Sequence, residues 1–309
     1  MEERPANKES GVRRMRHALL IMAHGDTTVL ERCLSILDSP YIDFYIHMDA
    51  KNKEDYSYLK TACSTSRVIL TRRIPVYWAD YSQIEAELIL IEAAVKNDYD
   101  YYHLISGMDL PLKTPGEFNQ FFEEQENKGF EFIKPFATSE AFEENKLRVT
   151  MRYPFIRIIK RGNNKYINLL QKSLFTRILR FRKPAEKNIV KQLGWNVYIG
   201  ENWFSITHAF AEYLLQSKGI IEQYFSDGYT ADEVFAITIL KNSVFKDHLG
   251  KAKTRLIDWE RGKPYVWRMS DKDQLLSSQH LFARKFDVSI DSGIVEELSV
   301  ELLSRKQDE

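Results

Sequence analysis

Short apolar runs that end in turn residues alternate with helical patterns over the first 135 residues, and this alternation constrains the fold most. The runs read HALLIMA at 17–23, DFYIHM at 43–48 and YYHLI at 101–105. Each has the length of a buried strand. The spacing of apolar residues predicts helices at 27–37 and 81–96. We therefore expect an α/β fold with a mostly parallel, Rossmann-like sheet flanked by helices.

The ends of these strands are the first place to look for a binding site. In open parallel sheets, ligands bind beyond the carboxyl ends of the strands. Gly25-Asp26, Asp49 and Ser106–Asp109 follow the three apolar runs directly. After residue 135 the pattern becomes a mixture of short strands and helices. We expect one domain over 17–309, preceded by a polar, disordered leader at 1–16.

Composition excludes several classes of partner and site. Lys plus Arg and Asp plus Glu both number 44, so the chain lacks the positive charge of a nucleic-acid-binding protein. Two cysteines, Cys33 and Cys63, do not suggest a disulfide framework, and Cys33 lies in an apolar helical pattern. We expect a reducing, cytoplasmic location, with peripheral contact to the inner face of a membrane as an extension of it.

The segment 146–183 is strongly basic, with twelve Lys and Arg residues and no Asp or Glu. Tyr, Leu and Ile residues recur within it at helical spacing. Two interpretations stay open. The segment is either an amphipathic surface element that contacts an anionic membrane or a lipid-diphosphate acceptor, or a solvated helix that pairs with acidic parts of the same chain.

Familiar metal and phosphate motifs are absent: no glycine-rich phosphate loop, no HExxH and no close pair of histidines occur. Two Asp-x-Asp triplets are present, at 98–100 and 271–273. The first precedes its predicted strand and the second opens a predicted helix, so both are expected to be turns or caps. We therefore expect no metal ligands, and a bound diphosphate would be neutralised by Arg and Lys.

Five stretches together resemble the core-2/I-branching β-1,6-N-acetylglucosaminyltransferase and peptide-O-xylosyltransferase family. They are HALLIMAHGD, FYIHMDAK, YYHLISGMDLPLK, GENWFSITHAFAEYLL with TADEVFAITIL downstream, and HLFARKFD. They occur in the family's order and cover roughly residues 17–290. The resemblance implies a GT-A-type fold, a nucleotide-sugar donor, an inverting mechanism and no metal cofactor, in a bacterial-type member. It makes 17–135 the nucleotide-sugar-binding half and 136–309 a mixed α+β acceptor and catalytic half.

The resemblance also implies a base and its electrostatic partners. The base is Glu233, in an Asp-Glu pair that opens a predicted helix at 231–240; it would take the proton of the acceptor hydroxyl. From the residues alone, an acid in a first helical turn is more commonly one that complements the helix dipole, and the resemblance reverses that preference. The resemblance places diphosphate contacts on cations near the C-terminus: Lys285 first, then Arg284, and Arg268 with Arg261 as its rival.

The remaining site residues follow from the same resemblance. Asp49 matches a His-x-Asp motif that binds uridine or ribose. The residues expected to complete the base pocket are His24, Gly25, Tyr77 and Trp78, and those expected to line the donor sugar are Gly107, Met108 and Asp109. The residues expected to bind the acceptor are Glu131, Trp203, Asp232 and Trp259, the tryptophans by stacking on sugar rings. For each, an ordinary turn or core position is the alternative.

The sequence thus predicts an enzyme that transfers a sugar from a UDP-sugar to a hydroxyl of a glycan or lipid-linked saccharide. N-acetylglucosamine is the favoured sugar and xylose the next. A catalytically silent sugar- or nucleotide-binding module, and a sugar-nucleotide hydrolase, are the competing interpretations. The hydrolase would be expected to need metal ligands, which the sequence does not offer.

Overall fold

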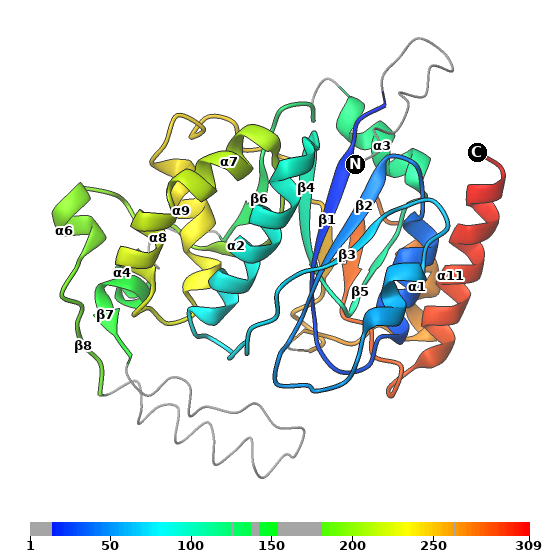
Figure 1. Ribbon diagram of the computed structural model, residues 1–309, viewed down its shortest axis with the longest axis horizontal. Helices are drawn as coiled ribbons and strands as arrows, with labels where there is room; N and C mark the ends of the chain where they lie inside the picture. Colours follow the sequence, from blue (N-terminus) through cyan, green and yellow to red (C-terminus); the bar gives the residue numbers. More distant parts are fainter. Residues whose placement is uncertain (1–13, 125–126, 137–141, 154–180, 263) are drawn as a thin grey trace.

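The computed structural model describes residues 14–124, 127–136, 142–153, 181–262 and 264–309. A six-stranded sheet with the order β3-β2-β1-β4-β9-β6 forms its centre (Figure 1). The strands are β1 (His17–Ala23), β2 (Ile42–Met48), β3 (Val68–Leu70), β4 (Tyr101–Ser106), β6 (Phe132–Pro135) and β9 (Gly200–Thr207). The first four are parallel, whereas β9 runs antiparallel to β4 and β6. The predicted GT-A-type α/β fold is confirmed, and both halves of the chain contribute to this one sheet.

A second sheet brings the C-terminal part of the chain to β4. It has the order β10-β11-β5, with β5 (Asp109–Pro111), β10 (Arg255–Ile257) and β11 (Phe282–Arg284). β11 is parallel to β10 and antiparallel to β5. Only Gly107 and Met108 separate the end of β4 from β5, so the exit of β4 leads directly into this sheet. A two-stranded ribbon of β7 (Met151–Arg152) and β8 (Lys183–Pro184) lies apart.

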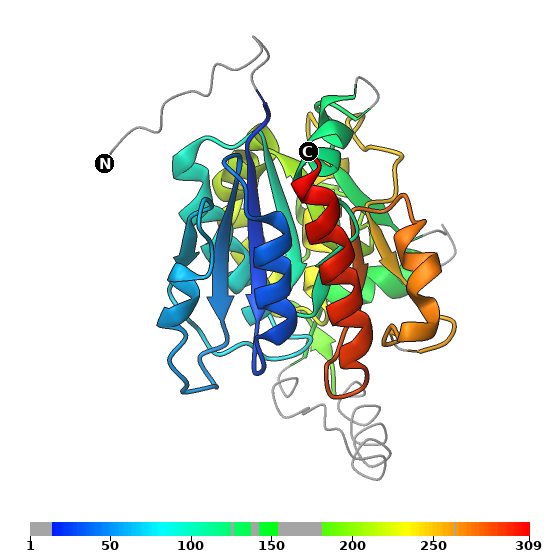
Figure 2. The ribbon, with the colours of Figure 1, turned by 90° about the vertical axis from the view of Figure 1, so that its right-hand side faces the viewer.

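Helices cover both faces of the main sheet. Those on one face are α1 (Thr28–Leu37), α3 (Pro115–Glu123) and α11 (Ser292–Gln307). Those on the other are α2 (Ser82–Ala94), α7 (His208–Gln216), α8 (Lys218–Phe225) and α9 (Phe235–Lys241). Figure 2 shows α1 and α11 side by side on the first face. The shorter elements are α4 (Phe142–Thr150), α6 (Ile189–Leu193), α10 (Lys272–Leu276), η1 (Ser57–Thr61), η2 (Val95–Asn97), η5 (Ala231–Glu233) and η6 (Met269–Asp271).

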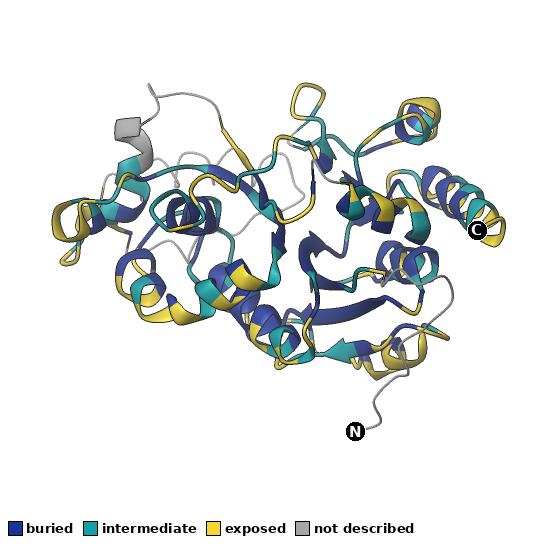
Figure 3. Cartoon of the chain, turned by 90° about the horizontal axis from the view of Figure 1, so that it is seen from above, coloured by how far each residue is buried: buried dark blue, intermediate teal, exposed yellow. Residues whose placement is uncertain are grey.

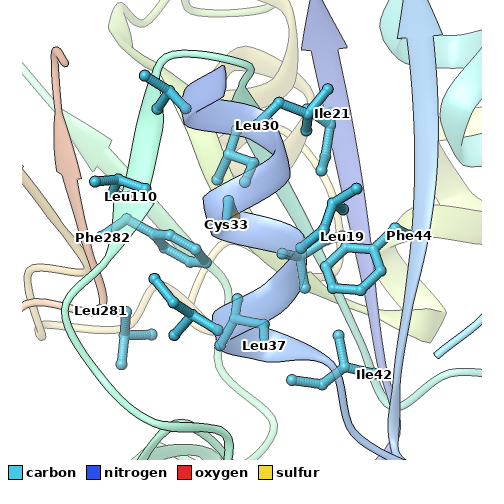
Figure 4. Close-up of a cluster of buried hydrophobic side chains, with 14 of the residues drawn as sticks. Leu19, Ile21, Leu30, Cys33, Leu37, Ile42, Phe44, Leu110, Leu281 and Phe282 are labelled. Carbon is cyan, nitrogen blue, oxygen red and sulfur yellow. The ribbon is translucent and has the colours of Figure 1, made fainter. Parts of the chain in front are cut away.

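Alternation along β1 divides the core into two layers. Leu19 and Ile21 pack toward α1, while Ala18 and Leu20 pack toward α2. Figure 4 shows Cys33 of α1 among these apolar side chains, with Phe282 of the second sheet beside it, so α1 lies between the two sheets. Burying each such leucine or phenylalanine contributes about 2 kcal/mol. The central strands β1, β2 and β4 are almost wholly buried, and the outer helix faces are exposed (Figure 3).

Two predicted boundaries were wrong. The predicted helix at 231–240 is divided: η5 ends at Glu233, Val234 leaves helical geometry at φ −120°, and α9 begins only at Phe235. Arg16 is not disordered, because its backbone N–H donates to Asp100 (2.7 Å).

Most of the basic segment 146–183 lies outside the described residues, so its contact with a membrane stays a prediction. The described ends of the segment form the last turns of α4 and the β7–β8 ribbon. Residues 1–13 of the expected leader also lie outside the description. No helix in the described ranges is both long and apolar enough to cross a membrane.

Candidate active site

The exits of β1, β2 and β4 meet at one edge of the sheet. The backbone N–H of Asp49 donates to Ala23 (2.9 Å), and that of Gly107 donates to Met22 (3.0 Å). A Cβ at Gly107 would lie 2.8 Å from the Cβ of Ala23, so this approach requires glycine. Gly25 adopts φ +70°, which also favours glycine. The structure therefore brings these predicted donor-side residues together.

Asp49 is buried and held in a fixed orientation at this edge. One carboxylate oxygen accepts from the N–H groups of Lys51 (2.9 Å) and Val76 (3.3 Å), and the other lies 3.2 Å from the ammonium of Lys51. That ammonium also lies over the ring of Tyr77 at 4.9 Å. Lys51 was not among the predicted site residues, although it follows Asp49 by two positions in the family-like stretch FYIHMDAK.

His24 lies between this cluster and the cations near the C-terminus. Desolvation lowers its pKa, Asp49 opposes that effect, and the charges of Lys285, Lys51 and Arg284 lower the pKa further. The first strand exit, the second strand exit and the C-terminal cations therefore share one electrostatic environment. The imidazole of His24 is neutral at pH 7, since its pKa lies below the ordinary value of about 6.5.

Arg284 is a fixed cation in this environment. Antiparallel pairing of β11 with β5 sets it opposite Asp109, and its guanidinium reaches the Asp109 carboxylate at 2.9 Å and the hydroxyl of Ser106. It also lies 4.5 Å above the ring of Trp203. Lys285 follows directly and accepts, at its carbonyl, the N–H of Trp267 (3.0 Å). Two adjacent cations at one strand exit suit a diphosphate.

One predicted contact is corrected here. Asp109 was expected to line the donor sugar, but it is 1% exposed and its oxygens accept from the N–H and hydroxyl of Ser106, both at 2.8 Å. Its carboxylate holds Arg284. The guanidinium of Arg284 covers one face of the ring of Trp203, and stacking of that tryptophan on an acceptor sugar stays a prediction. Met108 stays at the edge, where its carbonyl accepts from the N–H of Phe286 (2.9 Å).

The two rival arginines differ in their partners. The guanidinium of Arg261 lies 2.5 Å from Asp258 and 2.7 Å from Asp271, and it stacks on Tyr265 at 4.0 Å. Its charge is therefore neutralised by Asp258 and Asp271. Arg268 is exposed and directly follows Trp267, whose backbone is bonded to Lys285. Arg268 is thus the better placed of the two for a diphosphate.

Glu233 lies in η5, beside the start of α2. Thr230, with φ +43°, donates its N–H to Ala79 (3.0 Å) and fixes the turn that leads into η5. The guanidinium of Arg148 reaches Glu233 at 2.5 Å and the hydroxyl of Thr230 at 2.8 Å. Glu233 is half-buried, so part of its side chain is accessible beside its partner. Arg148 was not predicted, because no sequence pattern links it to a residue 85 positions away.

Asp232 does not face the acceptor side as expected. It is 8% exposed, and one oxygen accepts from the side-chain amide of Gln83 in α2 (2.9 Å). Burial raises its pKa to about 7, and the charge of Glu233 adds to the rise. A buried carboxyl group bonded to α2 cannot also bind an acceptor sugar, so this prediction is corrected.

The two remaining tryptophans differ in exposure. Trp78 meets Tyr229 edge to face at 6.3 Å and packs with Ala79 and Tyr153, which matches the core alternative. Trp259 is 51% exposed. It follows β10, which is parallel to β11, so it emerges at the same edge as Arg284. Trp259 is therefore available to an acceptor.

Glu131 lies at the opposite edge of the sheet. Thr207 pairs with Tyr101 at the start of β4, and both oxygens of Glu131 are bonded to Thr207: one to its N–H (2.8 Å) and one to its hydroxyl (2.6 Å). Glu131 is fully buried, and burial raises its pKa to about 7. It joins β6 to the first turn of α7, so its predicted acceptor role is corrected.

The Asp-x-Asp triplets have structural partners. Asp98 occupies the left-handed end of η2 at φ +58°, and Asp100 accepts from Arg16. Asp271 accepts from the N–H of Arg268 (3.0 Å) and pairs with Arg261. In the part of the chain that the structure describes, no group of three or more His, Cys, Asp or Glu side chains could hold a metal ion.

Comparison with known proteins identifies the family. The sequence model of the Core-2/I-Branching enzyme family matches residues 18–274, most of the chain. The chain belongs to this family. A human beta-1,3-galactosyl-O-glycosyl-glycoprotein beta-1,6-N-acetylglucosaminyltransferase is 24% identical over 89% of this chain and 66% of its own length. A Danio rerio beta-1,6-N-acetylglucosaminyltransferase 4 of the same type is 22% identical over 94% of this chain and 70% of its own.

The family member described here thus spans just under two thirds of the human relative's length. Among solved structures, apo mouse xyloside xylosyltransferase 1 covers 87% of this chain and 96% of its own. Its TM-score is 0.36 and its identity 13%, too low to carry an argument about function. Family membership and the geometry of the sheet edge therefore carry the functional conclusion.

Proposed function

We propose that this Core-2/I-branching family member is an inverting glycosyltransferase that moves a sugar from a UDP-sugar to an acceptor hydroxyl without a metal ion. The observations that carry the proposal are a half-buried Glu233 paired with Arg148 beside the start of α2, and a fixed Arg284 followed by Lys285 at the exit of β4. N-acetylglucosamine is the favoured sugar, by the names of the relatives, and xylose is the next. The acceptor is a glycan or a lipid-linked saccharide.

The proposed base and the proposed cations come from different elements. Glu233 belongs to η5, whereas Arg284 is the last residue of β11 and Lys285 follows it. In an inverting transfer the acceptor oxygen attacks the anomeric carbon from the face opposite the leaving diphosphate. The Arg148 guanidinium holds the side chain of Glu233 in place at 2.5 Å, and a carboxylate in that position is the group proposed to take the proton.

The step balances with groups already present. The acceptor oxygen forms a bond to the anomeric carbon and gives its proton to Glu233. The bond from that carbon to the diphosphate oxygen breaks, and its electron pair stays on UDP. Arg284 and Lys285 offset the charge that develops on the leaving oxygen, which is most effective in a site that excludes water.

A UDP-release assay in the presence of EDTA tests this proposal. We expect the wild-type chain to release UDP with UDP-N-acetylglucosamine or UDP-xylose and an acceptor, and Glu233→Gln to be about 100- to 10,000-fold slower. Thermal-shift titration with the same donors separates binding from turnover, because a bound donor raises stability. Equal rates for the two proteins would remove Glu233 as the base. Release abolished by EDTA and restored by a divalent ion would overturn metal independence.

A further inference from the structure

Two buried carboxyl groups lie in η5, the element that carries Glu233, and in α2, which packs against it. Glu87 in α2 is fully buried, and Asp232 is the neighbour of Glu233 in η5. Within the described ranges, both carboxyl oxygens of Glu87 and Oδ1 of Asp232 lack a hydrogen-bond partner. Buried carboxyl oxygens without partners are costly, so native structures rarely keep them. This cluster therefore calls for a physical explanation.

Three elements meet at the cluster. Gln83, one turn before Glu87, donates its amide to Oδ2 of Asp232 (2.9 Å) and accepts the N–H of Ala79 (2.6 Å). Asn202 of β9 faces Glu87 and precedes Trp203, the residue beneath Arg284. The cluster thus connects η5 with α2 and with the strand that supports the cations.

The charges around the cluster do not allow both carboxyl groups to ionise. The charged groups that act on Asp232 are Glu233 and Arg148, and the one that acts on Glu87 is Asp232. Arg148 already pairs with Glu233. Burial raises the pKa of Glu87 well above its ordinary value, and the nearby charge of Asp232 raises it further. At neutral pH Glu87 is therefore a neutral acid with an O–H to donate.

We propose that Glu87 is a positioning residue, whose protonated carboxyl group donates to the unpartnered Oδ1 of Asp232 and fixes η5 against α2. Gln83 holds the other oxygen of Asp232, so the two donors attach η5 at two points. Glu233 is the next residue, and its orientation toward an acceptor follows from this attachment. The inference rests on the proposed role of Glu233 as the base.

The attachment depends on one proton. When Glu87 loses it at high pH, two negative charges face one another in a buried site, and the hydrogen bond to Asp232 is replaced by repulsion. We expect η5 to shift and the turnover rate to fall on the alkaline side. Donor binding should change little, because the donor-side cluster around Asp49 lies on other elements.

Glu87→Gln tests the attachment, since its amide keeps a donor that does not titrate. We expect the alkaline fall of kcat to move to higher pH by at least about one unit, with the KM for the donor unchanged. Glu92→Gln is the matched control: it removes the same charge from the same helix, but at an exposed position paired with Lys218. Its kcat profile should follow that of the wild type.

A stability measurement gives a readout independent of activity. The folded-state pKa of Glu87 is raised, so the stability that it contributes is present at low pH and is lost as pH rises toward that pKa. The melting temperature of Glu87→Gln, relative to that of the wild type, should therefore rise as pH increases from about 5 to about 9. Parallel melting curves together with superimposable kcat profiles would overturn the inference. If the wild type itself transfers no sugar, the proposed function fails, while the melting comparison still decides the state of Glu87.

Discussion

Arg284 and Lys285 are adjacent in sequence but differ in what depends on them. Arg284 neutralises Asp109, which is buried at the centre of the molecule, and it stacks on Trp203. Lys285 acts on the donor side, where its charge reaches His24. One cation therefore serves both the fold and the site, and the other serves mainly the site.

Alanine substitutions should separate the two roles. Lys285→Ala should lower kcat/KM by about 100-fold, as when one donor to a developing anion is removed, with little change in the free energy of unfolding. Arg284→Ala should lower activity and also cost about 3 kcal/mol of stability, because it leaves Asp109 buried without its cation. Urea unfolding beside steady-state kinetics checks both. Equal stability losses for the two variants would contradict this division.

At the scale of elements, the junction of β6, β9 and α7 depends on Glu131. Its two oxygens bind the N–H and the hydroxyl of Thr207, the N-cap of α7. Glu131→Ala would leave both donors of Thr207 without this partner, at a cost of about 2 kcal/mol. The KM for the acceptor should not change, because the junction lies at the edge opposite the site. A raised acceptor KM with unchanged stability would instead restore the acceptor role expected from the sequence.

Elements that are long or apolar could be predicted from the sequence, whereas elements of three residues could not. β1 matches its predicted bounds and α1 differs from its prediction by one residue, since each shows its hydrophobic pattern over a full element. β5 and β11 are too short for a periodic signal, and only tertiary pairing makes them strands. The division of η5 from α9 was missed, because helical geometry breaks at Val234 and neither Gly nor Pro marks that position in the sequence.

The same contrast holds within the candidate site. Residues that follow strands directly, such as Asp49 and Gly107, could be placed from the sequence. The burial of individual side chains could not be predicted from the sequence. Asp232 and Glu131 were expected to contact substrate, and both are buried. The partners Arg148 and Glu87 lie far along the chain from Glu233, and no periodicity or spacing reports such contacts.

For the whole molecule, buried histidines make stability depend on pH. The ring of His47 accepts the N–H of Ile74 (3.0 Å), which requires an unprotonated nitrogen, and burial lowers its pKa to about 4. His17, in the central sheet, has its pKa lowered to about 4 by the same cause. The unfolded chain binds these protons at a higher pH than the folded chain does. The stability that each neutral histidine contributes to the fold is therefore lost as pH falls from about 6.5 to about 4. Glu131, with its raised pKa, titrates in the opposite direction over much of this range.

The buried histidines and Glu131 change stability with pH in opposite directions. The contribution of one group is therefore measured by comparing a variant of that group with the wild type. His47→Gln keeps an acceptor for the N–H of Ile74 but cannot gain a proton. Relative to the wild type, its free energy of unfolding should rise as pH falls from about 7 to about 4.5, by at most about 3 kcal/mol. Urea unfolding at three pH values measures the difference. A difference that stays constant with pH would show that His47 is not a source of acid sensitivity.

The ion pair between Asp109 and Arg284 joins residues 175 positions apart, and it closes the donor edge of the sheet. A chain leaving the ribosome therefore carries the strand exits of the parallel sheet long before it carries the cations that complete them. Until β11 emerges, Asp109 has no guanidinium to neutralise it, and β5 lacks a partner strand. Assembly of the candidate site is thus a late event in synthesis, and a nascent protein that stalls before residue 284 would display the three strand exits without Arg284 and Lys285.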